Sequence, residues 1–278
     1  MNSNSSEPRE FPLSKQEFSQ LCALAYRYTG IVLGGHKRHM VYGRLVRRLR
    51  ALRLSDFSQY LPLIDHVDKP ETDHFINAIT TNLTSFFREQ HHFDFIADTA
   101  VAQWQQRHTD YRLRLWSAGC SSGEEAYSLA VTLCKNLNLL TWDVKILATD
   151  IDSRMLQFAA EGQYEKAQVG KLHQADLEQW FDTDKEAMGL RVKNKVKDLV
   201  RFKRLNLLEK WPMKGPFDLI MCRNVMIYFD KPTQQDLLRR FSELLCPGGY
   251  LMVGHSETLH YDSELFAPMG KTIYRRRG

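Results

Sequence analysis

The chain of 278 residues has few cysteines, and their arrangement excludes two kinds of stabilised scaffold. Its five cysteines are odd in number and widely spaced, and no two of them form a C-x-x-C pair. A disulfide framework and a cysteine-based zinc site both depend on such regular spacing, so neither is expected. The sequence therefore predicts a protein of the reducing cytoplasm that binds no metal.

Long hydrophobic runs are also missing. No apolar stretch approaches the ~20 residues that a membrane-spanning helix needs, so direct membrane insertion is not expected. The first ten residues lack the hydrophobic core of a signal sequence, and residues 1–13 are predicted to form a disordered lead-in. Hydrophobic residues at 43% and charged residues at 26% are typical of a globular protein.

Acidic residues are absent from residues 36–53, although seven residues of this segment are lysine or arginine. Leu45 and Leu49 lie on one side of the predicted helix and the arginines on another. Like charges three and four residues apart destabilise a helix, which disfavours a purely solubilising role. We predict a docking surface for an acidic partner, either a protein helix or a nucleic-acid backbone. Its arginines are Arg44, Arg47, Arg48, Arg50 and Arg53.

The chain divides into a helical and an α/β part. Between residues 14 and 83 apolar residues recur at helical intervals, which predicts a small helical domain. Residues 84–278 alternate strand and helix patterns, as is typical of an α/β domain. Within them, residues 162–202 contain weaker alternating segments that suggest a small antiparallel insert.

A strand, a turn of small residues and a helix start follow one another in residues 113–130. Gly119 and Gly123 let the backbone approach a ligand closely, because no side chain is in the way. Glu124 and Glu125 fall in the first turn of the helix, where their charge would repel a pyrophosphate. The positively charged S-adenosylmethionine suits this turn better than a dinucleotide does, although an ordinary strand-to-helix turn has a similar pattern.

Polar residues also mark two other segment boundaries. Asp150 ends the next predicted strand, where it could accept hydrogen bonds from ribose hydroxyls or cap the following helix. Asp152 is expected to cap that helix. Residues 80–89 combine several hydroxyls with Asn82 and Arg88, which could bind a ligand. Alternatively, Thr84 in this segment could cap the helix that follows.

Three segments together resemble the chemotaxis receptor methyltransferases, the CheR family. They are residues 80–89, the loop that begins at Trp116 and ends at Glu125, and residues 222–230, which read Cys-Arg-Asn-Val-Met-Ile-Tyr-Phe-Asp. The resemblance covers nearly the whole chain. It implies a Rossmann-like class I S-adenosylmethionine-dependent methyltransferase domain with a small β-subdomain insert, preceded by a small helical domain.

The resemblance implies that these segments line a site for S-adenosylmethionine, with S-adenosylhomocysteine as the product. Glu125 would face the ammonium group of the cofactor and Asp150 its ribose, while Arg88 and Tyr228 would lie at the reacting centre. The implied cofactor-binding residues are Asn82, Thr84, Arg88, Ala118, Glu125, Asp150, Asn206, Leu207, Cys222, Arg223 and Asn224.

The implied reaction is methylation of glutamate side chains on chemoreceptors, for chemotactic adaptation. A glutamate is ionised at neutral pH, so no general base is required, and no Ser/His/Asp or Cys/His constellation is evident. The partner would be the cytoplasmic helical bundle of a membrane receptor, attracted by the arginines, and a monomer would suffice. Family members that bind a receptor's C-terminal peptide have a glycine-bearing loop where residues 182–189 contain a single glycine here.

Two other functions fit parts of the sequence. A nucleic-acid methyltransferase would share the cofactor fold and would use the basic helix to bind phosphates. Such enzymes, when they methylate amino groups, usually carry an Asn/Asp-Pro-Pro-aromatic motif, whereas residues 224–228 read Asn-Val-Met-Ile-Tyr. A binding module without enzymatic activity is the other alternative, which the intact acidic and amide positions disfavour.

Overall fold

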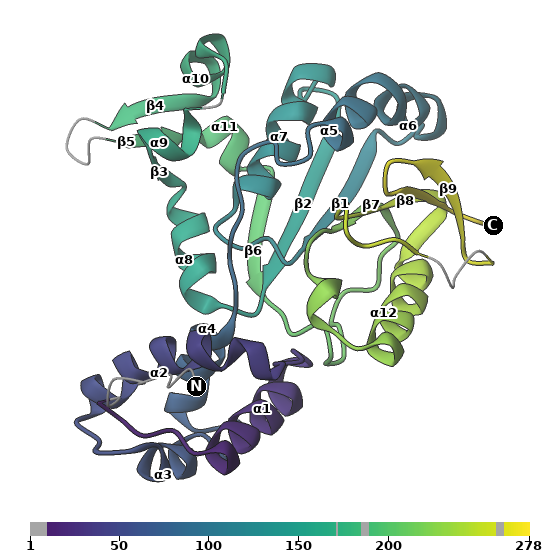
Figure 1. The fold of residues 1–278 in the computed structure, drawn as a ribbon. Helices are drawn as coiled ribbons and strands as arrows, with labels where there is room; N and C mark the ends of the chain where they lie inside the picture. The colour runs from purple at the N-terminus through teal and green to yellow at the C-terminus, as the bar shows by residue number, and fades with distance from the viewer. Residues whose placement is uncertain (1–9, 171, 185–188, 260–263) are drawn as a thin grey trace, which may run out of the picture. The chain divides into compact units, whose positions relative to one another are not determined.

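The computed structural model describes residues 10–170, 172–184, 189–259 and 264–278 (Figure 1). Contacts between residues divide the chain into two compact units, Met1–Thr81 and Asn82–Gly278. This division lies two residues before the predicted boundary between residues 83 and 84. Each unit has its own core, and the two are described separately.

Helices dominate the described part of the first unit. The first helix begins at a capping box, in which Ser14 and Glu17 satisfy each other's backbone N–H groups, and it ends at Gly30 with φ of 71°. Apolar side chains such as Leu21 and Leu49 are fully buried between the helices. The predicted helical domain is thus confirmed. Its helices are α1 (Lys15–Thr29), α2 (Arg38–Leu52), α3 (Phe57–Tyr60) and α4 (Pro70–Ile79), with the 3-10 turns Gly35–Lys37 and Leu61–Leu63.

The end of the predicted disordered lead-in belongs to this core. Phe11 and Leu13 are buried, with 8% and 5% of their surface exposed, and the N–H of Phe11 donates to the hydroxyl of Tyr42. The prediction of disorder was therefore wrong at these positions, because two apolar side chains are enough to anchor a short polar segment. Residues 1–9 lie outside the described residues.

A mixed seven-stranded sheet forms the centre of the second unit. Its spatial order is β6-β2-β1-β7-β8-β10-β9, with the first five strands parallel and the last two antiparallel to their neighbours. This arrangement confirms the α/β prediction. The strands are β1 (Arg112–Ala118), β2 (Asp143–Asp150), β6 (Val200–Arg204), β7 (Phe217–Cys222), β8 (Leu245–Val253), β9 (Phe266–Gly270) and β10 (Ile273–Arg276).

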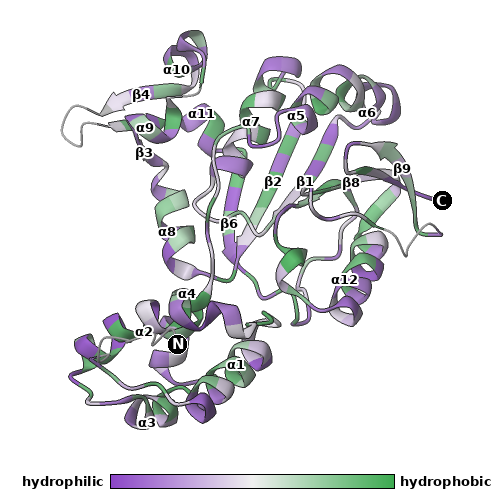
Figure 2. Cartoon of the chain, viewed as in Figure 1, coloured by the Kyte–Doolittle hydropathy of each residue, from purple (hydrophilic) through white to green (hydrophobic). Residues whose placement is uncertain are grey.

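Helices cover both faces of this sheet. Leu115 of β1 packs in a core with residues of α7, whereas the next residue, Trp116, packs on the other face against Phe241 of α12. Figure 2 shows the hydrophobic residues concentrated in these strands. A strand buried on both faces is typical of parallel sheets. The helices are α5 (His91–Phe95), α6 (Val101–Arg107), α7 (Glu124–Asn136), α8 (Ser153–Glu161) and α12 (Lys231–Leu244), and a π-helical segment, Ile96–Ala100, joins α5 to α6.

The insert is smaller than predicted. Its antiparallel sheet has the order β3-β5-β4 and is complete by Val192. Residues 200–202, which were assigned to the insert, belong to β6 and pair in parallel with β2. A short alternating segment has the same pattern in either sheet, so the sequence could not separate them. The insert contains β3 (Gln163–Glu165), α9 (Lys166–Val169), α10 (Gln174–Trp180), β4 (Phe181–Asp184) and β5 (Gly189–Val192), and α11 (Asn194–Lys197) leads back to β6.

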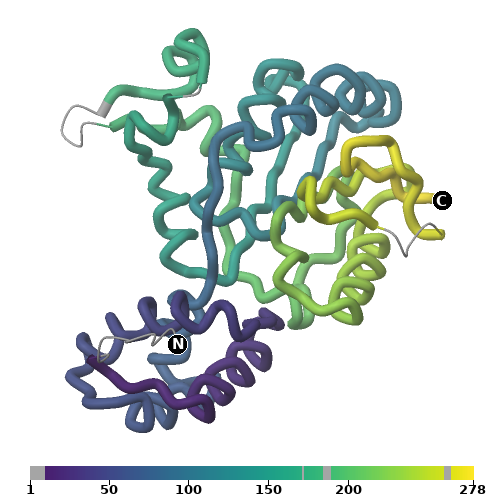
Figure 3. Tube along the Cα trace, viewed as in Figure 1, coloured from purple at the N-terminus to yellow at the C-terminus, as the bar shows by residue number. Residues whose placement is uncertain are grey.

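The strand order reverses at β1. From β1 the chain continues to β2 and then β6 on one side, whereas β7 pairs with the other side of β1 (Figure 3). In open α/β sheets the connections at such a point leave in opposite directions, and ligands bind at the carboxyl ends of the strands there. The fold thus directs attention to the residues that follow β1 and β7.

Candidate functional site

The loop after β1 is pressed against the segments that follow β2 and β7. Gly119 has φ of 88°, and a Cβ atom at this position would lie 2.3 Å from Cγ2 of Val225. The N–H groups of Gly119 and Cys120 both donate to the carbonyl of Thr149, at 2.8 and 2.9 Å. Only glycine fits here, because a side chain would collide and the backbone conformation would be strained.

Asp150 at the end of β2 holds the same loop in place. Its carboxylate accepts the N–H of Ser121 at 2.8 Å and the N–H of Asp152 at 2.9 Å. Burial raises the pKa of Asp150 to about 6. A carboxylate has about four acceptor positions, so a ligand hydroxyl can still bind to it. Asp152 caps α8, as predicted, by accepting the N–H groups of Arg154 and Met155.

Glu125 lies in the first turn of α7 and is buried. One of its oxygens accepts the hydroxyl of Ser117 at 2.7 Å, and the other accepts a guanidinium N–H of Arg223 at 3.1 Å. Burial raises the pKa of Glu125, and the neighbouring Arg223 opposes that rise. Residues 117 and 223 follow or end adjacent strands, so two strands jointly orient this carboxylate.

Arg223 connects three segments of the site. Its side chain is 1% exposed, its guanidinium lies 3.4 Å from Oε2 of Glu89, and it donates to the backbone carbonyl of Arg88. The sequence assigned Arg223 to the cofactor, whereas its hydrogen-bond and ion-pair partners in the structure are protein groups. Glu89 was not predicted at all, and its signal was weak because it is a single acid within residues 80–89.

Side-chain hydrogen bonds hold the segment before α5 against the loop after β1. The side-chain amide of Asn82 donates to Asp152 at 2.9 Å, and the backbone carbonyl of Asn82 accepts the hydroxyl of Ser121 at 2.9 Å. The guanidinium of Arg88 donates to the carbonyl of Leu83. The alternative that Thr84 caps the next helix is wrong, since α5 starts without a side-chain cap. A ligand role for Thr84 stays a prediction.

Glu257 organises the segment after β7 and was also missed. Its carboxylate accepts the N–H groups of Asn224, Gly254 and Ile227, at 2.7, 2.6 and 3.1 Å. Asn224 adopts φ of 60°, a left-handed conformation that asparagine tolerates better than most residues. Half-buried Tyr228 ends the 3-10 turn Met226–Tyr228 that this carboxylate supports.

The remaining predicted residues lie at the same edge of the sheet. Cys222 and Ala118 are buried at the ends of β7 and β1. Asn206 follows β6, where its side chain accepts the N–H of Leu208 at 3.1 Å, and Leu207 beside it is buried. The predicted cofactor residues of the second unit thus come from the ends of four strands, the first turn of α7 and the segment before α5.

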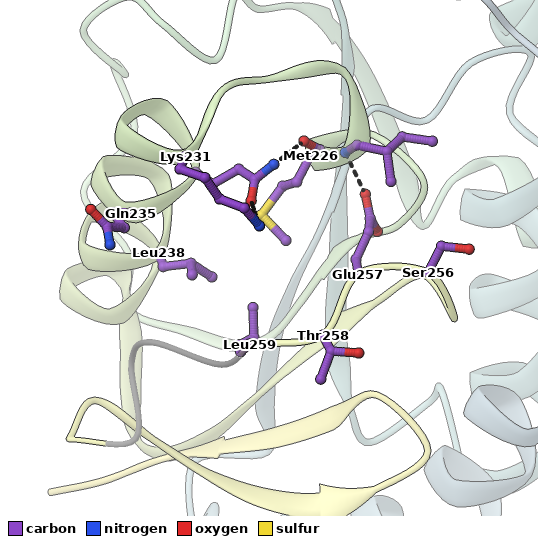
Figure 4. A pocket seen from close by; sticks show the side chains of 10 residues that line it. Met226, Lys231, Gln235, Leu238, Ser256, Glu257, Thr258 and Leu259 are labelled. Carbon is purple, nitrogen blue, oxygen red and sulfur yellow. Dashed lines mark hydrogen bonds between the residues drawn. The ribbon is translucent and has the colours of Figure 1, made fainter.

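Glu257 also lines a cavity of about 320 Å³. Figure 4 shows the Glu257 carboxylate pointing toward the turn that contains Met226, with the cavity bounded by α12. None of the predicted cofactor residues lines it. Its lining residues are Met226, Ile227, Lys231, Gln234, Gln235, Leu238, Ser256, Glu257, Thr258 and Leu259.

Three arginines of the predicted docking surface have acidic or carbonyl partners within the first unit. Arg48 donates two hydrogen bonds to Glu71, which also accepts the hydroxyl of Tyr60. Arg44 donates to the last carbonyls of α4, and Arg50 pairs with Glu10. The idea that this helix lacks acidic partners was therefore wrong, because they come from outside residues 36–53. Arg47 and Arg53 are exposed.

These groups fit a positively charged nucleoside cofactor. Asp150 and Glu125 are buried carboxylates with acceptor capacity for hydroxyl and ammonium groups. The first turn of α7 carries Glu124 as well as Glu125, which disfavours a phosphate. Among the described residues, no helix is long and apolar enough to cross a membrane.

Comparison with known proteins identifies the family. Residues 16–80 match the all-alpha domain of CheR methyltransferases, and residues 82–275 match their SAM binding domain. The chain is 46% identical over 266 residues to the chemotaxis protein methyltransferase of Salmonella typhimurium, covering 94% of this chain and 90% of that protein. It is 45% identical to the chemotaxis protein methyltransferase of Escherichia coli (94% and 91% covered) and 44% identical to chemotaxis protein methyltransferase 2 of Pseudomonas aeruginosa (96% and 95% covered). The chain therefore belongs to the CheR family of methyltransferases, with S-adenosylmethionine as its cofactor.

Proposed function

We propose that this protein methylates glutamate side chains of chemoreceptors, producing glutamyl methyl esters and S-adenosylhomocysteine. The observation that carries the proposal is the similarity, over nearly the full chain, to chemotaxis protein methyltransferases. The site supports it, because Arg88 and Tyr228 are the groups expected at the reacting centre and neither needs to remove a proton. A glutamate acceptor is already ionised at neutral pH, so it requires no general base.

The residues of the site would act mainly by positioning. When bound, S-adenosylmethionine supplies a methyl carbon attached to a positively charged sulfur. Arg88 uses one N–H on Leu83, and its planar guanidinium can orient a carboxylate through other N–H groups. Glu257 holds the turn that bears Tyr228. Correct alignment of reacting groups lowers a barrier by ~7–11 kcal/mol in favourable cases.

The partner would be the acidic helical bundle of a receptor in the cytoplasm, approached by a monomer of this protein. Exposed Arg47 and Arg53 would attract its glutamates. The nucleic-acid alternative has no support from the relatives, which are named for chemotaxis proteins. In the sequence, the loop at residues 182–189 stands where some family members bind a receptor peptide. Residues 185–188 of this loop lie outside the described residues.

The bond that carries the transferred methyl group tests the proposed substrate. Incubation with methyl-labelled cofactor and receptor-containing membranes is expected to label receptor protein, and mild alkali is expected to release the label as methanol. A carboxyl methyl ester hydrolyses under these conditions, whereas a methylated base or amine does not. Alkali-stable label, or label incorporated only into added nucleic acid, would overturn the proposal.

Binding of S-adenosylhomocysteine is expected to weaken below pH 6, because protonation of Asp150 removes the charge that hydroxyl groups bind. With a pKa of about 6 in the free protein, affinity should fall roughly fivefold between pH 6 and pH 5. The effect of this group on folding stability has the opposite direction. Because the pKa of Asp150 in the folded protein lies above the ordinary value of 3.8, its protonation as the pH falls favours the folded state. Loss of binding therefore cannot come from unfolding through this group.

Calorimetric titrations at pH 7.5, 6 and 5 measure this effect. Asp150→Asn is the matched variant, since it keeps the shape of the side chain and cannot ionise. It is expected to bind more weakly at pH 7.5 and to show a much flatter profile. Parallel profiles for the two proteins would remove Asp150 from cofactor binding.

A further inference from the structure

Three side chains that can act as metal ligands lie together beside the site, and the proposed function uses neither of the two histidines among them. Glu89 precedes α5, and His91 and His92 begin it. Each of the three side chains offers one ligand atom within 4.8 Å of the others. The sequence had predicted no metal site, because that prediction considered only the cysteines.

The hydrogen bonds of the two histidines determine which ring nitrogens are available. Nε2 of His91 lies 3.1 Å from the carbonyl oxygen of Lys271, and Nε2 of His92 lies 3.2 Å from the same oxygen. A carbonyl oxygen can only accept. The Thr272 hydroxyl, 3.1 Å from Nε2 of His92, itself donates to that carbonyl, so each Nε2 carries the hydrogen. In a neutral ring, Nδ1 then keeps its lone pair. This assignment gives the cluster two nitrogen ligands.

Two buried atoms of the cluster lack hydrogen-bond partners. The ring of His92 is fully buried, and its Nδ1 has no hydrogen-bond partner. Oε2 of Glu89, whose side chain is 10% exposed, also has no hydrogen-bond partner. These two atoms are 3.7 Å apart. Arg223 lies 3.4 Å from Oε2 without donating a hydrogen bond to it. Nδ1 of His92 therefore has no donor, and Oε2 of Glu89 has only the guanidinium of Arg223 beside it, so a bound cation would give both acceptors a partner.

We propose that Glu89, His91 and His92 bind a divalent transition metal of the zinc class through Oε2 and the two Nδ1 atoms. Neutral imidazole and carboxylate ligands suit Zn²⁺, at about 2.0–2.2 Å from the metal. The Nε2–H groups donate to a backbone carbonyl, which is the usual second partner of a metal-bound histidine. Small side-chain movements would bring the three atoms together, and a water or His255 could complete the coordination.

The position of this site links it to the cofactor. Glu89 is an ion-pair partner of Arg223, and Arg223 also binds Glu125. A metal ion would draw the Glu89 carboxylate away from Arg223 and leave the guanidinium to Glu125 alone. Glu125, paired more fully with Arg223, would then attract the ammonium group of the cofactor less. Metal binding should therefore lower the affinity for the cofactor, and cofactor binding should lower the affinity for the metal by the same factor.

Direct metal binding to untagged full-length protein tests the proposal, with Co²⁺ as a spectroscopic probe and Zn²⁺ as its competitor. We expect one equivalent of Co²⁺ to bind and Zn²⁺ to displace it. His92→Ala and Glu89→Gln should each raise the Kd for Co²⁺ by roughly 100-fold or more. Changing only the residues that hydrogen-bond to metal ligands already lowers metal affinity by about 10–100-fold. His173→Ala, an exposed histidine of the insert, is the control and should bind as the parent does.

His91→Ala is the variant that spares the core, because the ring of His91 is half-exposed whereas that of His92 is buried. It should also raise the Kd, while thermal unfolding stays as in the parent. Three results would overturn the proposal: no binding by the parent protein, equal Kd values for His91→Ala and His173→Ala, or a thiolate-to-cobalt charge-transfer band. The last would assign the metal to cysteines.

Discussion

Arg223→Met is expected to lower the free energy of unfolding of the second unit by about 3–5 kcal/mol. The guanidinium is 1% exposed and is the cationic partner of Glu125 at 3.1 Å and of Glu89 at 3.4 Å. Removing it leaves two carboxylates in a buried position without that cation. The cost of such an unpaired charge exceeds the net value of the ion pair itself.

Urea unfolding followed by tryptophan fluorescence measures this change selectively. All five tryptophans of the chain lie in residues 82–278, so their emission reports only on the second unit. Arg112→Met is the matched control, since this arginine is 60% exposed and lies 4.0 Å from Asp143. It should change the free energy by less than about 1 kcal/mol.

A double variant separates the charge effect from lost packing. Arg223→Met combined with Glu125→Gln should recover part of the loss, because one of the two unpaired carboxylates is then neutral. If the double variant is less stable than the sum of the single changes predicts, the ion pair does not explain the effect of Arg223. S-adenosylhomocysteine binding should be lost in the double variant, since Glu125 is expected to meet its ammonium group.

Arg47 and Arg48 are neighbours on α2, but their replacement by glutamate is expected to have different effects. Arg48→Glu should impair folding, and Arg47→Glu should impair receptor methylation. Arg48 donates two hydrogen bonds to Glu71, whose side chain is only 10% exposed, so a glutamate there would face a second carboxylate. We expect it to destabilise the first unit by about 2–4 kcal/mol, less than a fully buried pair because Arg48 is 25% exposed.

Arg47→Glu should leave folding unchanged and slow receptor methylation by roughly tenfold, since electrostatic attraction can change association rates by 10–10³. The effect should shrink as salt is added. Initial methylation rates, S-adenosylhomocysteine affinity and circular dichroism on heating distinguish the two variants. Equal methylation by Arg47→Glu and the parent protein would exclude this arginine from receptor attraction.

The sequence could predict the fold because its signals are local. The glycine turn, the acidic first turn of α7 and Asp150 at the end of β2 each lie within a few residues of the strand that positions them. The parallel sheet then brings these strand ends together without further information. The helix cap at Asp152 was predicted for the same reason.

Partners distant in sequence could not be predicted in this way. Glu71 neutralises Arg48 from 23 residues away, and Glu257 binds Asn224 from 33 residues away. The pairing of Arg223 with Glu89 spans two segments that meet only in the folded chain. For the same reason the histidine cluster was invisible, since its tautomers depend on the carbonyl of Lys271 near the other end of the unit.

The two sides of the ligand site are held in place in different ways. β1 lies between β2 and β7, and its successive side chains Leu115 and Trp116 anchor opposite cores. The turn that leaves it therefore starts from a point with little freedom, so the nucleoside finds this wall already formed and loses little entropy in ordering it. The facing segment bends through left-handed residues at Phe87 and Glu89, a conformation that persists only where the surrounding structure holds it. Both sides of the site are therefore formed before the nucleoside binds.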